Sequence, residues 1–340
     1  MLIKKTIFAL LFISFALFSR DYKKYSKSEF AMGTNLAVTF FSYDGKKNAN
    51  KILAECFRLA GDLEKKVSCK NAISTIYKLN SVKKGDVSDD FTLELLKNSL
   101  YYAELTDGLF DPALYNVIEL WGFESGENKI PEIKEILAAL KSSGYKNVAI
   151  DGKTIVLSNG ASLDLGGIAK GAIIGKIAEY LKSVGLKDFL INGGGDIVVG
   201  GLYAGQRKWR IAIANPFNQN ETVGMVELTD CSVVTSGDYE RYFISEDGIR
   251  YHHIIDPRTG TPANNGVHSA TVIADSPVKA DALSTALFVA GVKEALELVK
   301  KTTGVKTIFI SGNKEDFKLD YSDNISHTIR DGKYYFEVKE

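Results

Sequence analysis

Residues 278–291, VKADALSTALFVAG, have the small and apolar side chains of a helix that packs closely against a core. Pro277 precedes this run and Gly291 ends it, as is typical at the start and end of a helix. Asp281 and Thr285 are four residues apart, so their side chains share one helix face with Cβ atoms ~5–6 Å apart. One interpretation is structural, in which Asp281 complements the helix dipole and Thr285 bonds a preceding carbonyl. The other is a hard-oxygen pair that, with a backbone carbonyl, suits Mg²⁺ better than zinc.

The rest of the chain mixes strands and helices without a regular alternation. Hydrophobic periodicity predicts helices at residues 50–67, 91–105, 131–141 and 166–185. The predicted strands are residues 34–41, 154–157, 161–165, 188–201, 209–216, 222–229, 268–275 and 307–311, with a hairpin at 241–257 that turns at 246–248. The Asn159-Gly160 pair predicts a further hairpin turn between residues 154–157 and 161–165. Because βαβ units are absent from this order, the pattern favours an α+β fold over a doubly wound sheet.

The balanced charge and the N-terminal segment indicate an exported protein with no general affinity for nucleic acid or anionic membranes. The 340 residues include 42 Lys and Arg and 42 Asp and Glu, so no overall field points to nucleic acid or an anionic membrane as a partner. Lys4 and Lys5 precede an apolar run at residues 6–18, which is the layout of a secretory signal. An uncleaved membrane anchor is the alternative. We therefore expect residues 1–20 to be a signal or anchor and residues 21–340 to form an extracytoplasmic body.

Two glycine-rich turns are candidates for phosphate contact. In LDLGGIAKG, residues 163–171, Asp164 is predicted to end a strand, and Gly166-Gly167 lead into a helix with Lys170 in its first turn. Glycines allow close approach of a ligand to the backbone, and helix-start amides attract phosphate oxygens. The run NGGGDI, residues 192–197, suggests a second close approach. A tight turn with a solvated lysine and a β-bulge explain the two runs almost equally well.

The segment YHHIIDPRTGTP, residues 251–262, concentrates His, Asp, Arg and Thr. His252 and His253 are neighbours on a predicted strand, so they should face opposite sides and only one enters a given site. Asp256-Pro257 would begin a rigid turn that presents Arg258. A surface turn with an incidental histidine pair is the alternative, but the density of these residue types favours a functional site.

In this order, these segments resemble the ApbE family of FAD:protein FMN transferases. The matching pieces are FAMGTNLAV, SCKNAISTIYKLN, DGLFDPAL, LDLGGIAKG, NGGGDI, WRIAIANP, VVTSGDYERYF, HHIIDPRTGTP and SATVIADSPVKADALSTAL, within residues 30–291. The resemblance implies a T-fold-like α+β architecture of two intimately joined lobes. It also implies a secreted, Mg²⁺-dependent enzyme that binds FAD as substrate, moves FMN to a Thr or Ser of an acceptor protein and releases AMP.

The resemblance implies roles for individual residues at the matching positions. Contacts to the flavin nucleotide are implied for Met32, Leu109, Phe110, Asp111, Asp164, Lys170 and Ile255. Metal ligands are implied at Asp281, Thr285 and the carbonyl of Gly167, with Ser284 as an additional candidate beside them. His253 matches the general base, for which an ordinary histidine pKa near neutral would be suitable. Lys70 stands where many relatives have a flavin-contacting tyrosine, which puts aromatic stacking from this loop in doubt.

Three functions are consistent with these residues. Transfer of FMN to FMN-binding-domain proteins of membrane redox complexes is the leading hypothesis. A metal-dependent FAD pyrophosphatase would use water at the same site, as some members of the family do. A flavin-binding or trafficking protein without turnover is the third. The location implied is the periplasm, with inner-membrane attachment if the N-terminal segment is retained.

Overall fold

An antiparallel sheet of eight strands forms the centre of the computed structural model, which describes residues 21–123 and 126–339. Its strand order is β1-β2-β6-β7-β10-β15-β16-β17, and each neighbouring pair is antiparallel. These strands are β1 (Lys23–Ala31), β2 (Thr34–Ser42), β6 (Phe189–Gly193), β7 (Asp196–Gly200), β10 (Cys231–Gly237), β15 (Val267–Ala274), β16 (Lys306–Gly312) and β17 (Phe317–Tyr321). The signal or anchor predicted at residues 1–20 lies outside the described residues.

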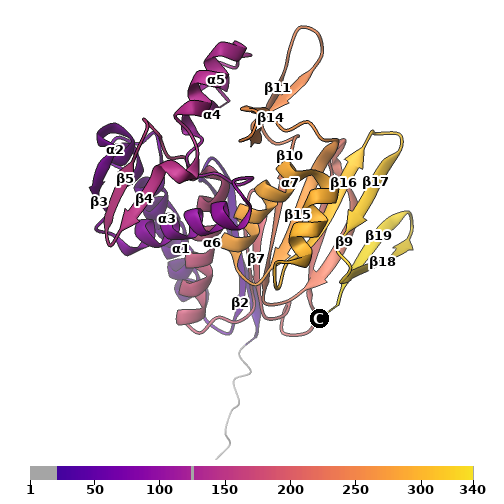
Figure 1. Cartoon of the computed structure of the whole chain (residues 1–340). Coiled ribbons are helices and arrows are strands. Elements are labelled where there is room, and N and C mark those ends of the chain that lie inside the picture. Colours follow the sequence, from indigo (N-terminus) through magenta and orange to yellow (C-terminus); the bar gives the residue numbers. More distant parts are fainter. Residues whose placement is uncertain (1–20, 124–125, 340) are drawn as a thin grey trace, which may run out of the picture.

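The central sheet is covered on both faces. Long helices pack on one face, namely α1 (Lys46–Val67), α6 (Gly166–Ser183) and α7 (Pro277–Lys300) (Figure 1). A smaller sheet packs on the other, formed by β8 (Trp209–Asn215), β9 (Asn218–Leu228), β18 (Ile325–Arg330) and β19 (Lys333–Val338). Side chains of β15 alternate between the two cores: Val272 packs in the helical layer and Ile273 against the smaller sheet. A strand buried on both faces therefore precedes α7.

A second part of the molecule is built around short elements. It contains the helices α2 (Thr75–Val82), α3 (Asp90–Leu105), α4 (Tyr115–Trp121) and α5 (Ile133–Lys141), a 3-10 turn η1 (Tyr145–Asn147), and a sheet of β3 (Lys84–Asp86), β4 (Val148–Asp151) and β5 (Thr154–Leu157) (Figure 1). Two small hairpins complete the fold, β11 (Tyr242–Ile244) with β12 (Arg250–His252) and β13 (Ile255–Asp256) with β14 (Thr261–Pro262). Leu96 of α3 and Leu283 of α7 belong to one buried cluster, so the two parts share a core.

The α+β prediction is confirmed, and the helices predicted at residues 50–67, 91–105, 131–141 and 166–185 are present with ends within a few residues of those expected. The strand predicted at residues 161–165 is wrong. Lys84–Asp86 and Val148–Asp151 pair with Thr154–Leu157 instead. The Leu163 backbone is held by the Asn80 side chain, which accepts from its N–H at 2.6 Å and donates to its carbonyl at 2.9 Å. An amide side chain thus takes the place of a neighbouring strand.

Two further elements differ from the sequence-based prediction. β1 was not expected, because its KKYSKSEFA sequence is almost wholly polar and the strand is an exposed edge of the sheet. The first helical segment of α7 ends at Gly291 as predicted, where φ is 74° and ψ is 162°, but a second segment that was not predicted continues from this break to Lys300. Within the ranges that the structure describes, no helix is both long and apolar enough to cross a membrane.

Candidate active site

One cavity of about 540 Å³ gathers the predicted site residues from across the chain. Its walls come from the β1–β2 turn, the end of α1, the loop after α3, the start of α6, the end of β10, the segment after β12 and the first turns of α7. The predicted residues that line it are Met32, Lys70, Leu109, Phe110, Asp111, Asp164, Gly167, Lys170, His253, Ile255, Asp281 and Thr285. Segments more than 250 residues apart therefore meet in a single site.

Close contact between α6 and α7 places Asp281 and Thr285 in the cavity wall. A Cβ at Gly171 would lie 2.3 Å from the carbonyl oxygen of Pro277 and 2.8 Å from the Cβ of Asp281. The Gly171 N–H donates to Asp281 Oδ2 at 2.7 Å. A Cβ at Gly167 would lie 3.3 Å from Thr285 Oγ1, so the Gly167 backbone faces that hydroxyl. The glycines of α6 thus allow the two helices to approach.

The structural interpretation of Asp281 as a helix-capping residue is wrong. Ser276 is the N-cap of α7 and accepts from the Lys279 N–H, while Pro277 occupies the first turn. Asp281 is only 3% exposed and lies beyond the first turn, where the helix dipole gives a carboxylate little stabilisation. Its position is explained by the contact with Gly171 and by the cavity.

Replacing Gly171 with alanine is expected to destabilise the fold by about 3 kcal/mol or more, because the added methyl group would overlap α7 backbone atoms. The free energy of unfolding from urea titration measures this effect. Gly61 in α1 is the matched control, since a Cβ there would meet nothing within 4 Å. Gly61→Ala should leave stability unchanged or raise it by up to about 1 kcal/mol. Equal stability of the two variants would contradict the close contact described here.

The charged groups around Asp281 form a buried network. Lys170 Nζ lies 2.8 Å from Asp196 Oδ2, and Asp196 is 1% exposed. Burial, reinforced by the negative charge of Asp196 and only partly offset by Lys170, raises the pKa of Asp281 to about 8. A carboxylate in this environment gains stability as an anion when a further cation is near.

The three atoms predicted to bind a metal ion at this site are all oxygens. They are the Asp281 carboxylate, the Thr285 hydroxyl and the carbonyl of Gly167, a residue that lines the same cavity and packs against Thr285. Among the residues that the structure describes, no group of three or more His, Cys, Asp or Glu side chains is arranged to hold a metal ion. A sparse set of hard oxygens fits Mg²⁺, which keeps waters and substrate phosphate in its other positions, and does not fit zinc.

Ser284 does not line the cavity, but it hydrogen-bonds to residues that do. It is fully buried, and its hydroxyl donates to the Asp281 carbonyl at 2.9 Å. Since that bond uses its proton, Ser284 Oγ accepts from Ser236 Oγ, 2.9 Å away. Ser236 Oγ also lies 3.5 Å from Thr285 Oγ1. Ser236, on β10, is therefore a cavity residue that connects both α7 hydroxyls.

His253 enters the cavity and His252 faces away from it, as the strand alternation predicts. His253 Nδ1 lies 3.2 Å from the Arg241 carbonyl oxygen, which only accepts, so Nδ1 carries the proton and Nε2 keeps its lone pair. His252 is buried and donates from Nε2 to the Ala263 carbonyl at 2.9 Å. Burial, with the positive charge of Arg241, lowers the pKa of His253 to about 3. The expectation of a pKa near neutral is therefore wrong for the substrate-free protein.

The residues predicted to contact flavin all line the cavity, but they differ in exposure and in the hydrogen bonds that they make to the protein. Met32 and Gly33 form the two-residue turn between β1 and β2, both with positive φ, and this turn brings Met32 to the cavity wall. Asp111 accepts backbone N–H groups of Ala113 and Tyr145 at 2.8 and 2.9 Å. Asp111 therefore shapes its loop as well as lining the cavity. Lys70 is exposed at the rim.

Several cavity residues were not predicted, namely Glu64, Asp196, Ser236, Glu240 and Arg241. Asp196 is the fifth residue of the NGGGDI run, and Ser236, Glu240 and Arg241 lie in VVTSGDYERYF. Both runs are recognisable as motifs in the sequence, but no spacing rule indicates which of their side chains face a ligand. The polar or charged side chains of these residues were the only signal that the sequence offered.

Residues 32–309 match the ApbE family. This chain belongs to the ApbE family. A FAD:protein FMN transferase of Treponema pallidum is 34% identical over 311 residues, which are 86% of this chain and 86% of that protein. A FAD:protein FMN transferase of Vibrio cholerae is 32% identical over 84% of this chain and 87% of its own length.

Solved ApbE structures share the fold of this ApbE-family chain. The crystal structure of the ApbE protein from Thermotoga maritima has a TM-score of 0.81 at 34% identity and covers 88% of this chain and 97% of its own. The flavin transferase ApbE from Vibrio cholerae has a TM-score of 0.79 at 29% identity, covering 89% and 98%. The family assignment made from sequence motifs is thereby confirmed. The roles of individual cavity residues remain predictions.

Proposed function

We propose that this ApbE-family chain transfers FMN from FAD to a Ser or Thr hydroxyl of an extracytoplasmic acceptor protein, with Mg²⁺ and with release of AMP. The observation that carries the proposal is the composition of one cavity. A hard-oxygen set at Gly167, Asp281 and Thr285 shares it with Lys170 and a neutral His253. The names of the relatives, FAD:protein FMN transferase, support the same reaction.

The proposed step is a displacement at phosphorus. The acceptor hydroxyl oxygen bonds to the phosphorus of the FMN half of FAD, and the bond from that phosphorus to the oxygen of the AMP half breaks. AMP leaves with the electron pair of that bond. The hydroxyl proton moves to His253 Nε2, whose lone pair is free because Nδ1 donates to the Arg241 carbonyl. Such reactions depend mainly on positioning and charge neutralisation rather than on covalent help from the protein.

The residues at the start of α6 are placed to bind the diphosphate. Gly166 and Gly167 begin the helix, and its N-terminal amides and dipole favour an anion. Lys170 follows one turn later and is oriented by its ion pair with Asp196. Mg²⁺ held by Gly167, Asp281 and Thr285 would supply further positive charge against the phosphate oxygens.

AMP release with and without acceptor tests the proposal. The purified protein is incubated with FAD and Mg²⁺, alone or with an FMN-binding-domain protein, and the acceptor is analysed by mass spectrometry. Transfer predicts AMP release that depends on acceptor and a mass gain equal to FMN less one water on a Ser or Thr. Release without acceptor would show the FAD pyrophosphatase reaction instead. FAD that stays intact in every mixture would contradict both and leave flavin binding or trafficking. Chelation by EDTA should stop turnover.

The location and partners belong to the same proposal. The pattern of residues 1–20 supports export, to the periplasm, with inner-membrane attachment if the segment is retained. The proposed acceptors are FMN-binding-domain proteins of membrane redox complexes. A fusion of this chain to a phosphatase that is active only outside the cytoplasm tests the export, and an inactive fusion would contradict it.

A further inference from the structure

The break in α7 leaves backbone carbonyls that need partners. In a regular helix each carbonyl accepts from the N–H four residues later. Gly291 has φ 74° and ψ 162°, a conformation open essentially to glycine, and it interrupts this pattern. Phe288 and Val289, in the turn before the break, are 0% and 1% exposed. Buried carbonyls of this kind require hydrogen-bond donors from elsewhere.

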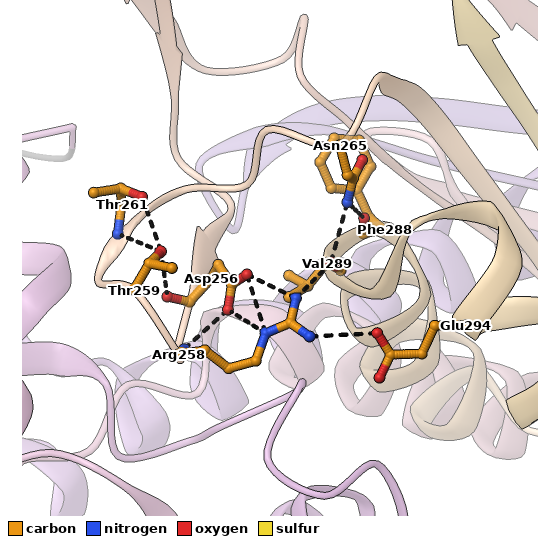
Figure 2. Close-up of polar contacts among 8 residues, drawn as sticks. All are labelled: Asp256, Arg258, Thr259, Thr261, Asn265, Phe288, Val289 and Glu294. Atoms are coloured by element: carbon orange, nitrogen blue, oxygen red, sulfur yellow. Dashed lines mark hydrogen bonds and ion pairs between the residues drawn. The ribbon is translucent and has the colours of Figure 1, made fainter.

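Side chains of the loop after His253 supply these donors (Figure 2). Asn265 Nδ2 donates to the Phe288 carbonyl at 2.9 Å and to the Val289 carbonyl at 3.1 Å. Arg258 Nη2 donates to the Val289 carbonyl at 3.4 Å. Asn265 also lies 3.4 Å from the position of a Cβ on Gly291, so the amide fits against the break itself.

Arg258 is held in place by a buried carboxylate. Its Nε donates to Asp256 Oδ1 at 3.0 Å and its Nη2 to Asp256 Oδ2 at 2.8 Å, and its backbone N–H donates to Oδ1 at 2.9 Å. Asp256 is 8% exposed. Nη1 reaches Glu294, beyond the break, at 3.3 Å. Figure 2 shows the guanidinium between Asp256 and the two segments of α7.

The loop and the helix that this contact joins both reach the cavity. The β13–β14 hairpin fixes Asp256 next to Ile255, a cavity residue, and His253 lies two residues further back. On α7, Val289 lies one turn after Thr285 and two turns after Asp281. Arg258 therefore connects the segment that carries the imidazole to the helix that carries the carboxylate and hydroxyl.

We propose that Arg258, with Asn265, is a positioning residue that sets the distance between His253 and the Asp281–Thr285 face of α7. This proposal rests on the proposed function, because it concerns the geometry of that reaction. A planar guanidinium is needed, since one group must bind a carboxylate through two parallel bonds and also reach a carbonyl. The contact does not touch the substrate, so it acts through the residues it holds.

Arg258→Ala tests the proposal through the rate of AMP release from FAD with Mg²⁺, under whichever acceptor condition supports wild-type turnover. We expect kcat to fall by about 10²-fold, because displacements of about 1 Å at reacting groups have effects of that size. The dissociation constant of FAD, from flavin fluorescence, should change by less than about threefold, since the cavity walls are intact. Arg258→Lys should not restore the rate. Added guanidinium ion, far below denaturing concentrations, should restore part of it in Arg258→Ala.

Matched variants separate positioning from general destabilisation. Arg210→Ala removes an exposed arginine–glutamate pair on the β8–β9 sheet, away from the cavity lining, and should keep the wild-type rate. Glu294→Gln weakens only an exposed contact and should also keep it. Asn265→Ala should lower kcat as Arg258→Ala does. It replaces Arg258→Ala as the test variant if Arg258→Ala folds poorly. A kcat in Arg258→Ala and Asn265→Ala equal to wild type, or a loss that follows only their unfolded fraction, would overturn the proposal.

A second readout distinguishes failure of this proposal from failure of the proposed function. If the wild-type protein releases no AMP, the proposed reaction is wrong, and hydrogen exchange still tests the contact. Amides of residues 278–290 and 251–256 should then exchange faster in Arg258→Ala than in wild type or Arg210→Ala. Unchanged exchange in both segments would overturn the positioning role independently of turnover.

Discussion

Replacing Asp281 with asparagine is expected to lower Mg²⁺-dependent FAD turnover by about 10³-fold, since a metal contributes several kcal/mol of charge stabilisation. The substitution removes the negative charge from the hard-oxygen set and keeps the shape of the side chain. The asparagine carbonyl can still accept from the Gly171 N–H, so the α6–α7 contact should be retained. The measurement is kcat for AMP release as a function of Mg²⁺ concentration.

Stability provides a second, opposite readout for the same variant. Burial and the charge of Asp196 raise the pKa of Asp281, which means that its ionised form destabilises the metal-free fold at high pH. Asparagine removes that cost, so the metal-free variant should unfold at the same or a higher urea concentration than wild type above pH 8. Asp275→Asn, at an exposed position before α7, is the control and should change neither quantity. Unchanged Mg²⁺ dependence in Asp281→Asn would refute the metal assignment.

Local sequence patterns predicted most helices and strands because those elements bury one face. Residues 50–67 repeat apolar side chains at helical spacing, and α1 buries that stripe, including Ile52, Cys56 and Leu63. Hydrophobic patterns failed where the backbone hydrogen bonds of a segment are made by distant side chains or strands. Residues 161–165 are apolar enough for a strand, but Asn80 satisfies the Leu163 backbone. β1 has no apolar face, so only its pairing with β2 reveals it.

Sequence motifs predicted part of the cavity lining, but they did not predict the charges and hydrogen bonds around it. Each predicted residue lies in a short motif, and the order of motifs identified the family that brings them together. Spacing within a motif could not show that Lys170 pairs with Asp196 or that Ser236 bonds Ser284, because those partners come from different elements. It also could not show the low pKa of His253, which depends on burial and on Arg241.

Replacing His253 with alanine is expected to slow FMN transfer by about 10²- to 10⁴-fold, the usual contribution of a general base. FAD affinity should change little, since most of the cavity wall remains. Single-turnover transfer and flavin fluorescence measure the two quantities, and exogenous imidazole should restore part of the rate. His327, which lies on β18 and does not line the cavity, is the control. His327→Gln should transfer FMN at the wild-type rate. Equal rates in His253→Ala and wild type would exclude an essential base at this position.

The pH dependence of the wild-type rate also tests whether His253 is the general base, because it shows whether the rate rises or falls with pH. A base acts in its neutral form, so the rate falls as the pH falls through its pKa. Because the pKa of His253 is about 3 in the free protein, kcat/KM should show no loss from this group at pH 5 to 7. The negative charge of bound FAD raises that pKa, so the acidic limb of kcat should lie at higher pH than that of kcat/KM. An acidic limb near pH 6.5 in kcat/KM that disappears in His253→Ala would instead mean that His253 is protonated readily, contrary to the burial and the Arg241 charge observed around it.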